Sequence, residues 1–173
     1  MSESCLDGLG LLVDIDVQRY ARHISLPQVG LEGQRKLNQS RVLVIGAGGL
    51  GSPALLYLAA AGIGHIGVVD DDVVDLSNLQ RQVIHSTATI GQLKVESASN
   101  RLLELNPGLT VSTYGVRLSP ENIESILAEG WDVVVDGTDN LPTRYLLDDA
   151  CFLKNIPWVY GSIYRFEGQV SVF

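Results

Sequence analysis

Cysteine and histidine are scarce in this sequence, which has two cysteines and three histidines among its 173 residues. Cys5 and Cys151 are far apart and neither belongs to a Cys-x-x-Cys pair, so nothing supports a disulfide framework or a zinc site. His23, His65 and His85 show no metal-ligand spacing, and we expect them to be structural or exposed. Cys151 lies in an apolar stretch, where a free cysteine behaves as a small buried hydrophobe.

Basic residues are also few, since 12 Lys and Arg are set against 20 Asp and Glu, for a formal net charge of −8. This balance argues against a broad nucleic-acid-binding surface. The apolar run at residues 9–13 follows no basic region and is far shorter than the roughly 20 residues that cross a bilayer. We therefore expect a soluble, cytoplasmic protein that binds neither nucleic acid nor membrane.

Hydrophobic residues make up 46% of the sequence, which is enough to build the core of one compact domain. Residues 1–15 show no clear period, and we expect them to be a disordered leader. An N-terminal arm follows, with two short helices predicted at residues 17–23 and 31–38. Pro27 and Gly30 separate these two helices as breakers.

Short apolar strands alternate with helices from residue 41 onward. The first, Arg41 to Ile45, is β-branched and is followed at once by glycines, as expected of a strand buried on both faces. Further strands are predicted at residues 66–70, 110–114, 132–136, 158–162 and 168–173, and helices at 50–61, 92–105, 120–128 and 142–154. The alternation predicts an α/β, Rossmann-like fold with a mainly parallel sheet and flanking helices. The chain ends in an apolar strand, and we expect it to stop inside a larger fold.

Glycines between the first strand and the helix after it form the pattern G-x-G-x-x-G, with Gly46, Gly48 and Gly51 at its fixed positions. Such a loop lets the backbone approach a phosphate, which the helix N-terminus attracts. Asp70 ends the next strand about 20 residues further on, where its carboxylate can accept hydrogen bonds from ribose hydroxyls. The pattern predicts a nucleotide without naming it. We interpret the nearby Asp71 and Asp75 as part of a solvated loop.

Cationic and amide side chains follow the second strand, and hydride transfer requires no such group. Asn78, Arg81 and Lys94 can converge on a triphosphate, where cations stabilise charge on phosphoryl oxygens and on leaving pyrophosphate. Asp139 follows the strand at 132–136, at the edge where open α/β sheets bind ligands. Its carboxylate suits Mg²⁺. Asp139 or Asn140 can equally cap the next helix, and for Asn140 both interpretations stay open.

Several phrases of the sequence, in this order, resemble the ubiquitin-activating (E1-like) superfamily of adenylating enzymes, which includes the molybdopterin-synthase and thiamine sulfur-carrier adenylyltransferases. They are Arg19-Tyr20-Ala21-Arg22-His23, Gly46-Ala47-Gly48-Gly49-Leu50-Gly51, Asp70-Asp71-Asp72, Ser77-Asn78-Leu79-Gln80-Arg81-Gln82, Gly91-Gln92-Leu93-Lys94 and Asp136-Gly137-Thr138-Asp139-Asn140. The resemblance runs from about Gln18 to Phe173, and this set is far more specific than one Gly-rich loop. Residues 16–173 then form an E1-like adenylation domain that is incomplete at its C-terminus.

This resemblance implies an adenylyltransferase that binds ATP and Mg²⁺. Its substrate would be the C-terminal Gly-Gly carboxylate of a ubiquitin-like sulfur-carrier protein, and pyrophosphate would be released. The residues implied to bind the nucleotide are Gly46, Gly48, Gly49, Gly51, Asp70, Asp72, Asn78, Arg81 and Lys94. Asp139 would hold the metal and act in catalysis with Arg81 and Lys94. In the family's homodimers, Arg22 would reach the γ-phosphate in the opposite subunit.

Full-length bacterial members of the superfamily continue with Cys-x-x-Cys pairs for zinc, which this chain lacks, so no zinc ligand is assigned. Two other functions stay open. An NAD-dependent dehydrogenase would share the Gly-rich loop and Asp70, but it gives Arg81, Lys94 and Asp139 no purpose. A related E1-like enzyme that dehydrates a threonylcarbamoyl-modified tRNA base is disfavoured by the acidic charge. The presence of Arg22, Arg81, Lys94 and Asp139 together also argues against a non-catalytic subunit.

Overall fold

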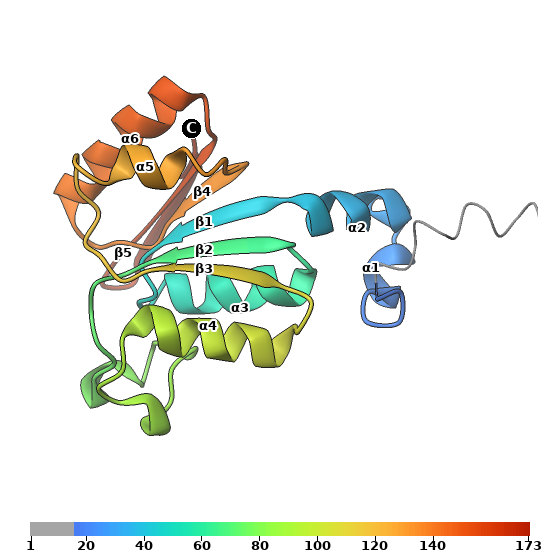
Figure 1. Ribbon diagram of the computed structural model, residues 1–173, viewed down its shortest axis with the longest axis horizontal. Coiled ribbons are helices and arrows are strands. Elements are labelled where there is room, and N and C mark those ends of the chain that lie inside the picture. Colours follow the sequence, from blue (N-terminus) through green and yellow to red (C-terminus); the bar gives the residue numbers. More distant parts are fainter. Residues whose placement is uncertain (1–15) are drawn as a thin grey trace, which may run out of the picture.

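The computed structural model of the chain describes residues 16–173, and from α2 onward helices and strands alternate (Figure 1). In chain order the elements are α1 (Ala21–Ile24), α2 (Gly30–Gln39), β1 (Arg41–Ile45), α3 (Gly51–Ala61), β2 (His65–Val69), η2 (Leu76–Asn78), η3 (Thr87–Thr89), α4 (Lys94–Leu105), β3 (Thr110–Tyr114), α5 (Ile123–Leu127), β4 (Val133–Asp136), α6 (Leu141–Lys154), β5 (Trp158–Tyr164) and β6 (Glu167–Val172). The expected leader, with Cys5, lies outside the described residues.

A six-stranded sheet with the order β3-β2-β1-β4-β5-β6 forms the centre of the structure. Strands β1 to β5 are paired in parallel, and β6 returns antiparallel beside β5. Ile45, the last residue of β1, lies opposite Val69 of β2 and Asp136 of β4. The carboxyl ends of these three strands therefore meet at one edge. This arrangement confirms the predicted α/β fold with a mainly parallel sheet.

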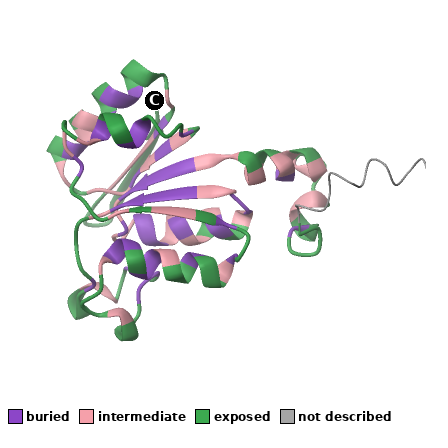
Figure 2. Cartoon of the chain, in the orientation of Figure 1, coloured by how far each residue is buried: buried purple, intermediate pink, exposed green. Residues whose placement is uncertain are grey.

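Helices cover both faces of the sheet, with α3 and α4 on one face and α5 and α6 on the other (Figure 1). Successive residues of β1 alternate between two cores. Val42 and Val44 pack with residues of α3 and α4, whereas Leu43 and Ile45 pack with residues of α5 and α6. Figure 2 shows that β1 is buried along most of its length. Because both faces are covered, the strand is apolar along nearly its whole length.

The N-terminal arm, α1 and α2, extends from the amino end of β1 and is held by buried polar groups. The Tyr20 hydroxyl accepts a hydrogen bond from Asn106 Nδ2 at 2.9 Å. Gln34 is 0% exposed, and its Nε2 donates to the carbonyl oxygen of Ala61 at 2.9 Å. An unpaired buried amide would be costly, so these bonds fix how the arm sits on the body.

Some predicted boundaries were wrong. The first helix begins at Ala21 rather than residue 17, because the Asp16 carboxylate accepts a hydrogen bond from Arg19 N and holds a turn ahead of it. The helix predicted at 120–128 is shorter, because the Asn122 side chain accepts from Ser119 N and closes a turn there. Strand β5 runs on to Tyr164, where it pairs with Glu167 of β6. Among the described residues, no helix has the length and apolar character that crossing a bilayer requires.

Candidate functional site

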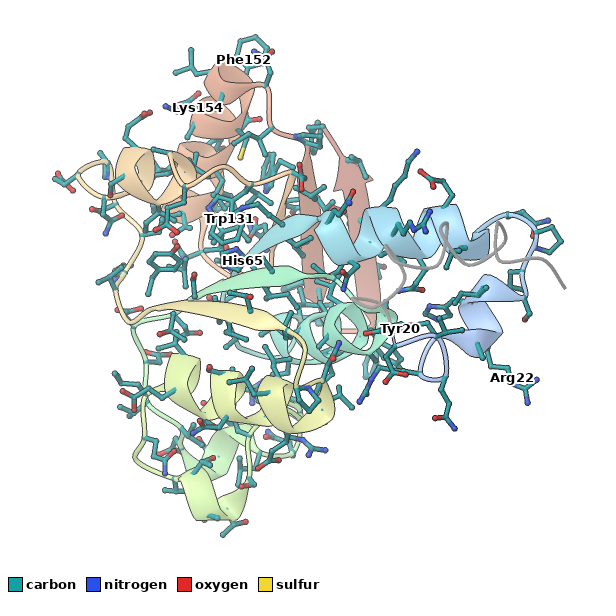
Figure 3. The ribbon with its side chains drawn as sticks, turned by 45° about the vertical axis from the view of Figure 1, so that its right-hand side comes forward. Tyr20, Arg22, His65, Trp131, Phe152 and Lys154 are labelled. Carbon is teal, nitrogen blue, oxygen red and sulfur yellow. The ribbon has the colours of Figure 1, made fainter. Side chains whose placement is uncertain are left out.

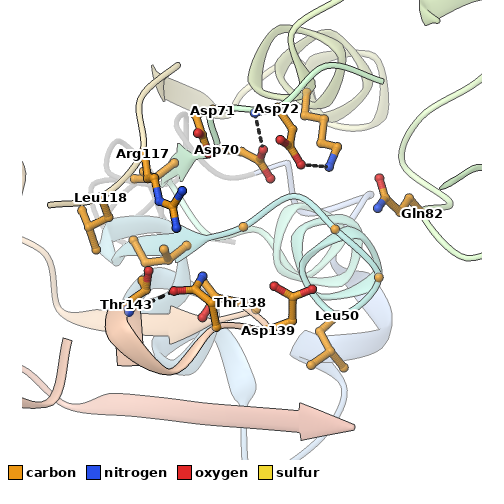
Figure 4. Close-up of a pocket in the computed structure, with 18 of the residues that line it drawn as sticks. Leu50, Asp70, Asp71, Asp72, Gln82, Arg117, Leu118, Thr138, Asp139 and Thr143 are labelled. Atoms are coloured by element: carbon orange, nitrogen blue, oxygen red, sulfur yellow. Dashed lines mark hydrogen bonds and ion pairs between the residues drawn. The ribbon is translucent and has the colours of Figure 1, made fainter. Parts of the chain in front are cut away.

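A cleft of about 920 Å³ opens at the carboxyl edge of the sheet. Its walls are the loops after β1, β2, β3 and β4 together with the end of β5 (Figure 4). Its lining includes the predicted metal ligand Asp139 and most of the residues predicted to bind nucleotide, namely Gly46, Gly48, Gly49, Asp70, Asp72, Asn78, Arg81 and Lys94. The volume falls in the range of about 300–1,000 Å³ typical of small-molecule sites.

The Gly-rich loop turns sharply between β1 and α3. Gly46 has a φ of +91°, which side chains rarely allow, and its N–H donates to the carbonyl oxygen of Val69 at 2.7 Å. A Cβ on Gly51 would overlap the carbonyl oxygen of Gly46, so only glycine lets α3 begin so close behind the loop. Gly51 is buried and lies outside the lining of the cleft. Its function in this geometry is therefore steric.

Gly48 and Gly49 line the cleft immediately before the first turn of α3. Neither carries a side chain that would separate the backbone from a ligand. The N-terminus of a helix presents unpaired N–H groups and the positive end of its dipole, and it therefore attracts anions. The 11-residue α3 is long enough for this effect, so the loop can hold a phosphate.

Asp70 lies between the Gly-rich loop and the loop after β2. Its Oδ2 accepts a hydrogen bond from Ala47 N at 2.8 Å, and its Oδ1 accepts one from Asp72 N at 2.9 Å. The carboxylate is thus held rigidly at the cleft wall. Each oxygen retains a further acceptor site, as the predicted contact with ribose hydroxyls requires.

Lys94 is the first residue of α4 and lines the cleft. The residue is 5% exposed, and its Nζ lies 2.7 Å from Asp72 Oδ2. Its backbone N–H donates to the carbonyl oxygen of Asp72 at 2.9 Å, which joins the start of α4 to the acidic loop. The predicted cation is therefore placed and ion-paired at the cleft wall.

Asn78 and Arg81 come from the loop that begins with η2. The Arg81 side chain is exposed, and its hydrogen bonds to the described residues are long, at 3.5 Å to the carbonyl oxygen of Ser77 and 3.4 Å to Gln80 Oε1. Its stem passes beside Gly49. Asn78 Nδ2 donates to Ser77 Oγ at 3.3 Å. Both side chains line the cleft. Because their hydrogen bonds are long, their polar groups can turn toward a ligand.

Asp71 and Asp75, both expected to be part of a solvated loop, differ in position. The Asp75 carboxylate accepts a hydrogen bond from Ser77 N at 2.8 Å and so caps η2, and hydrogen bonds from Ser77 lower its pKa. Asp71 instead lines the cleft. Oxygens of Asp70, Asp71 and Asp72 lie within 4.8 Å of one another. The acidic loop thus brings more negative charge to the cleft than the sequence analysis assigned to it.

The loop after β4 carries Asp139 and Asn140 to the opposite wall. The Asn140 side chain accepts a hydrogen bond from Thr143 N at 3.0 Å and caps α6, so the capping interpretation holds for this residue. Asp139 is exposed at the cleft. Within residues 16–173 its carboxylate has no hydrogen-bonded partner or ion pair, which leaves both oxygens available to a ligand or a metal.

A buried ion pair supports this loop. Asp136 Oδ1 accepts hydrogen bonds from Thr138 N at 2.8 Å and Thr138 Oγ1 at 2.7 Å, while Oδ2 faces Arg144 Nε at 3.8 Å. Burial raises the pKa of Asp136. Arg144 Nη2 donates to the carbonyl oxygens of Thr138 at 2.6 Å and Gly161 at 3.1 Å. Arg144 therefore ties the loop that carries Asp139 to β5.

The polar side chains of the cleft that were not predicted include Gln82, Arg117 and Arg144. Gln82 is 4% exposed, and its Oε1 has no partner among the described residues. Arg117 follows β3, and Figure 4 shows its guanidinium group turned into the cleft. The signal for Arg144 was present, because it lies one helical turn after the polar phrase at 136–140. The other two depend on loop paths that the sequence does not reveal.

Arg22 lies far from the cleft of its own chain. It is exposed on α1 and is not among the residues that line the cleft. Figure 3 shows its side chain projecting from the arm, away from the body. Tyr20 and Gln34 fix the arm to the body in a position where Arg22 does not reach the cleft of its own chain.

The remaining cysteine and histidines are structural, as expected. Cys151 is 2% exposed, and burial raises its pKa to about 11, which makes it a poor nucleophile at neutral pH. His23 bonds to Gln34, and His65 bonds to Ser112. In the described part of the chain, only Asp70, Asp71 and Asp72 form a cluster of three or more side chains that could hold a metal ion. This cluster contains no histidine and no cysteine.

Comparison with known proteins decides the family. The model of the ThiF family matches residues 20–173, which is nearly the whole chain. The chain belongs to the ThiF family. The match contains both the cleft and the arm.

Two curated relatives and one solved structure show the extent of this similarity. The chain is 55% identical over 158 residues to a probable adenylyltransferase/sulfurtransferase, MoeZ, of Mycobacterium tuberculosis, covering 91% of the chain and 40% of the relative. It is 52% identical over 158 residues to a sulfur carrier protein adenylyltransferase of Thermus thermophilus, covering 91% and 58%. The structure of the Escherichia coli tRNA N6-threonylcarbamoyladenosine dehydratase TcdA in complex with ATP matches with a TM-score of 0.79 and 28% identity, covering 84% of this chain and 60% of that one.

These relatives are longer than the chain, which spans about 40% of MoeZ and 58% of the Thermus enzyme. The similarity therefore supports the Rossmann-like fold and ThiF family membership. The TM-score of 0.79 independently supports the sheet order and the flanking helices. The substrates and partners of these longer relatives are proposals for this chain.

Proposed function

We propose that this ThiF-family chain provides the ATP-binding site of an enzyme that adenylates the C-terminal carboxylate of a ubiquitin-like sulfur-carrier protein. The observation that carries the proposal is the composition of the cleft. A Gly-rich loop at a helix N-terminus faces four cationic side chains, Arg81, Lys94, Arg117 and Arg144, while Asp139 is exposed without a partner in residues 16–173. A relative at 52% identity is named a sulfur carrier protein adenylyltransferase, which supports the same conclusion.

The proposed nucleotide contacts follow from position. Backbone N–H groups of Gly48 and Gly49 hold phosphate, Gly46 makes the turn that brings them there, and Gly51 lets α3 approach. Asp70 accepts from the ribose hydroxyls, with Asp72 beside it. Three further side chains contact the triphosphate. Asn78 and Arg81 come from the loop after β2, and Lys94 comes from the first turn of α4. A dehydrogenase would need none of these cations, so the cleft favours ATP over NAD.

Mg²⁺ suits the exposed carboxylate of Asp139, because this hard cation prefers carboxylate oxygens together with water and phosphate oxygens. The metal would neutralise charge on the phosphates of the nucleotide. We assign Asp139 as its protein ligand. No zinc site is proposed, because the chain contains no Cys-x-x-Cys pair.

The reaction requires positioning and charge stabilisation rather than a general base. The carboxylate of the carrier is already ionised at neutral pH, so its oxygen can attack the α-phosphorus directly. A new oxygen–phosphorus bond forms as the bond from the α-phosphorus to the bridging oxygen breaks. The electron pair leaves with pyrophosphate, and an acyl-adenylate remains. Arg81 and Lys94 offset the repulsion between the carboxylate and the triphosphate.

The proposed assembly is a homodimer in which Arg22 of each chain reaches the partner's cleft. Its exposed position on a fixed arm supports this role. The proposed partner is the carrier protein, with a tail that ends in Gly-Gly. Neither nucleic acid nor a membrane is a proposed partner, in keeping with the net charge of −8.

Calorimetric titration tests the nucleotide. We expect ATP with Mg²⁺ to bind and NAD⁺ to fail, and we expect Arg81→Ala and Asp139→Ala each to weaken ATP binding. Arg101→Ala and Asp149→Ala are matched controls, because both side chains are exposed and neither lines the cleft. Binding of NAD⁺ that ignores the Arg81 and Asp139 substitutions would support a dehydrogenase instead.

A second candidate function is favoured by one observation, the match to the ATP complex of a tRNA dehydratase. The acidic charge and the lower identity, 28% against 52%, disfavour it. Pyrophosphate release separates the two functions. We expect release with a carrier that ends in Gly-Gly and not with the same carrier lacking its last glycine. Release driven by threonylcarbamoyl-modified tRNA would identify the dehydratase.

A further inference from the structure

One buried histidine lies directly behind the Gly-rich loop and uses both ring nitrogens. His85 is 7% exposed, its Nε2 lies 3.0 Å from the carbonyl oxygen of Ala47, and its Nδ1 lies 2.9 Å from Ser97 Oγ. Ser97 Oγ lies 3.0 Å from Thr89 Oγ1, which donates to the carbonyl oxygen of Ser86 at 2.9 Å. The imidazole therefore belongs to a continuous polar chain inside the protein.

The partners of His85 determine which nitrogen carries the proton. A carbonyl oxygen only accepts, so Nε2 must hold the hydrogen that bonds to Ala47. Burial lowers the pKa of His85, which keeps the ring neutral. Nδ1 of the neutral ring lies 2.9 Å from Ser97 Oγ, whose single hydroxyl proton is donated to Thr89 Oγ1. The carbonyl oxygen of Ala47 therefore sets the tautomer, and Ser97 lies against the other edge of the ring.

The peptide group that His85 holds is central to the loop. Ala47 lies between Gly46 and Gly48 and is 0% exposed. Its N–H is held by Asp70 Oδ2 at 2.8 Å on one side, and its carbonyl oxygen accepts from His85 and from Ser52 Oγ, the latter at 3.2 Å, on the other. The direction in which the following N–H groups point depends on this clamped residue.

The other side of the imidazole is attached to the helix that carries Lys94. Ser97 lies on α4 one turn after Lys94, and both residues are buried. His85 thus bridges the loop that would hold phosphate and the helix that carries the phosphate-binding cation. A shift of either element would stretch one of the two polar contacts of the ring, to Ala47 or to Ser97.

We propose that His85 is a positioning residue of the nucleotide site, which holds the Gly-rich loop in its binding geometry and in register with Lys94. This inference rests on the proposed binding of ATP. His85 touches no ligand in it, because its two nitrogens are used by Ala47 and Ser97. The effect on binding comes through the loop backbone.

A pair of substitutions isolates the bond to Ala47. The side-chain amide of Gln reaches about as far as Nε2 of histidine, so His85→Gln keeps a donor for the Ala47 carbonyl oxygen. The shorter side chain in His85→Asn cannot reach it. We expect His85→Gln to bind ATP with Mg²⁺ within about threefold of wild type, and His85→Asn to bind about tenfold more weakly, as loss of one buried hydrogen bond predicts.

A second measurement separates positioning from general loss of stability. Backbone amide hydrogen exchange at residues 46–49 should accelerate in His85→Asn and stay near wild type in His85→Gln. Val134→Ala, a cavity variant in the opposite core, should lower thermal stability without changing exchange in the loop or affinity for ATP.

The outcomes distinguish the two proposals. If wild type binds no ATP, the proposed function fails, while loop exchange still decides whether His85 holds the loop. If wild type binds ATP, and both His85 variants match it in affinity and exchange, the positioning function is overturned. Equal weakening in both variants and in Val134→Ala would overturn it too. If His85→Asn does not fold, Ser97→Ala takes its place, and unchanged loop exchange there counts against the proposal.

Discussion

Lys94 and Asp72 form an unequal ion pair. Their charged atoms lie 2.7 Å apart, but the Lys94 side chain is only 6% exposed whereas that of Asp72 is 67% exposed. A buried ammonium group needs a partner, while an exposed carboxylate loses little if it returns to water. Asp72 therefore neutralises Lys94 in this structure, and under the proposed function a phosphate of ATP would replace Asp72.

The first prediction concerns this lysine. Lys94→Met keeps most of the buried stem and removes the charge, so we expect affinity for ATP to fall about tenfold or more, as loss of a charge-assisted contact implies. AMP has a single phosphate, so the affinity for AMP should fall less than the affinity for ATP. Calorimetric titration measures both ligands. Lys154→Met is the control, since Lys154 pairs with Glu124 on the surface and does not line the cleft. Equal loss for AMP and ATP would contradict a phosphate contact.

The second prediction concerns the close contact in the Gly-rich loop. In Gly51→Ala the new methyl group overlaps the carbonyl oxygen of Gly46, and neither backbone can move freely. We expect a loss of several degrees in Tm together with loss of ATP binding, since overpacking costs about 1–3 kcal/mol or more. Gly115→Ala, where the nearest atom lies 3.5 Å away, should change little in a thermal unfolding scan. A fully stable Gly51→Ala would show that the loop adapts.

The third prediction concerns the buried pair beneath Asp139. Arg144→Ala leaves the Asp136 carboxylate buried without its cation, which should cost about 3–5 kcal/mol in urea unfolding. Tyr145→Ala, at a neighbouring side chain that is 69% exposed, should stay within about 0.5 kcal/mol. Adding Asp136→Asn to Arg144→Ala should recover part of the loss, because the unpaired charge disappears. No recovery would mean that Arg144 stabilises mainly through Tyr160 and the carbonyl oxygens.

The fourth prediction is a pH dependence of stability. Burial lowers the folded-state pKa of His85 and of His65 below the ordinary 6.5, so the unfolded chain takes up protons at a higher pH than the folded one. The free energy of unfolding should therefore fall as pH drops below about 7, until the folded-state pKa is reached. Urea unfolding at several pH values measures the slope. His85→Gln and His65→Gln should each flatten it, and a slope unchanged in the double variant would contradict this source.

The fold was predictable because it rests on local patterns. β1 is apolar on both faces, glycines follow it at once, and the later strands and helices repeat the alternation, so sheet type and helix placement follow from the sequence. The arm was predicted less well. Its first helix depends on the bond of Asp16 to Arg19, and its position on the body depends on the buried Gln34, whose partner Ala61 lies far along the chain.

The cleft was predicted where its residues occur in compact phrases next to strand ends. Asp70 and Asp139 were found because carboxyl ends of parallel strands meet at one edge. Arg117 and Gln82 were missed, since their contribution depends on how long loops fold back over that edge. His85 was expected to be structural, and its link to the Gly-rich loop emerges only when residues 47, 85 and 97 are seen together in space.

The last prediction tests whether Arg22 acts across a dimer. Arg22→Ala and Asp139→Ala should each bind ATP poorly as pure proteins. In an equimolar mixture whose subunits exchange, about half of the dimers contain one chain of each variant. In such a dimer, the Arg22→Ala chain keeps its own Asp139 and receives an intact Arg22 from its partner, so one of the two clefts is complete. About a quarter of all sites should therefore recover wild-type affinity. Titration calorimetry counts these sites. A mixture of Arg81→Ala and Asp139→Ala is the matched control, because both residues line the cleft of their own chain and no mixed dimer regains a complete one. Recovery in neither mixture would place Arg22 outside the site, and recovery in both would show that clefts share more than the arm.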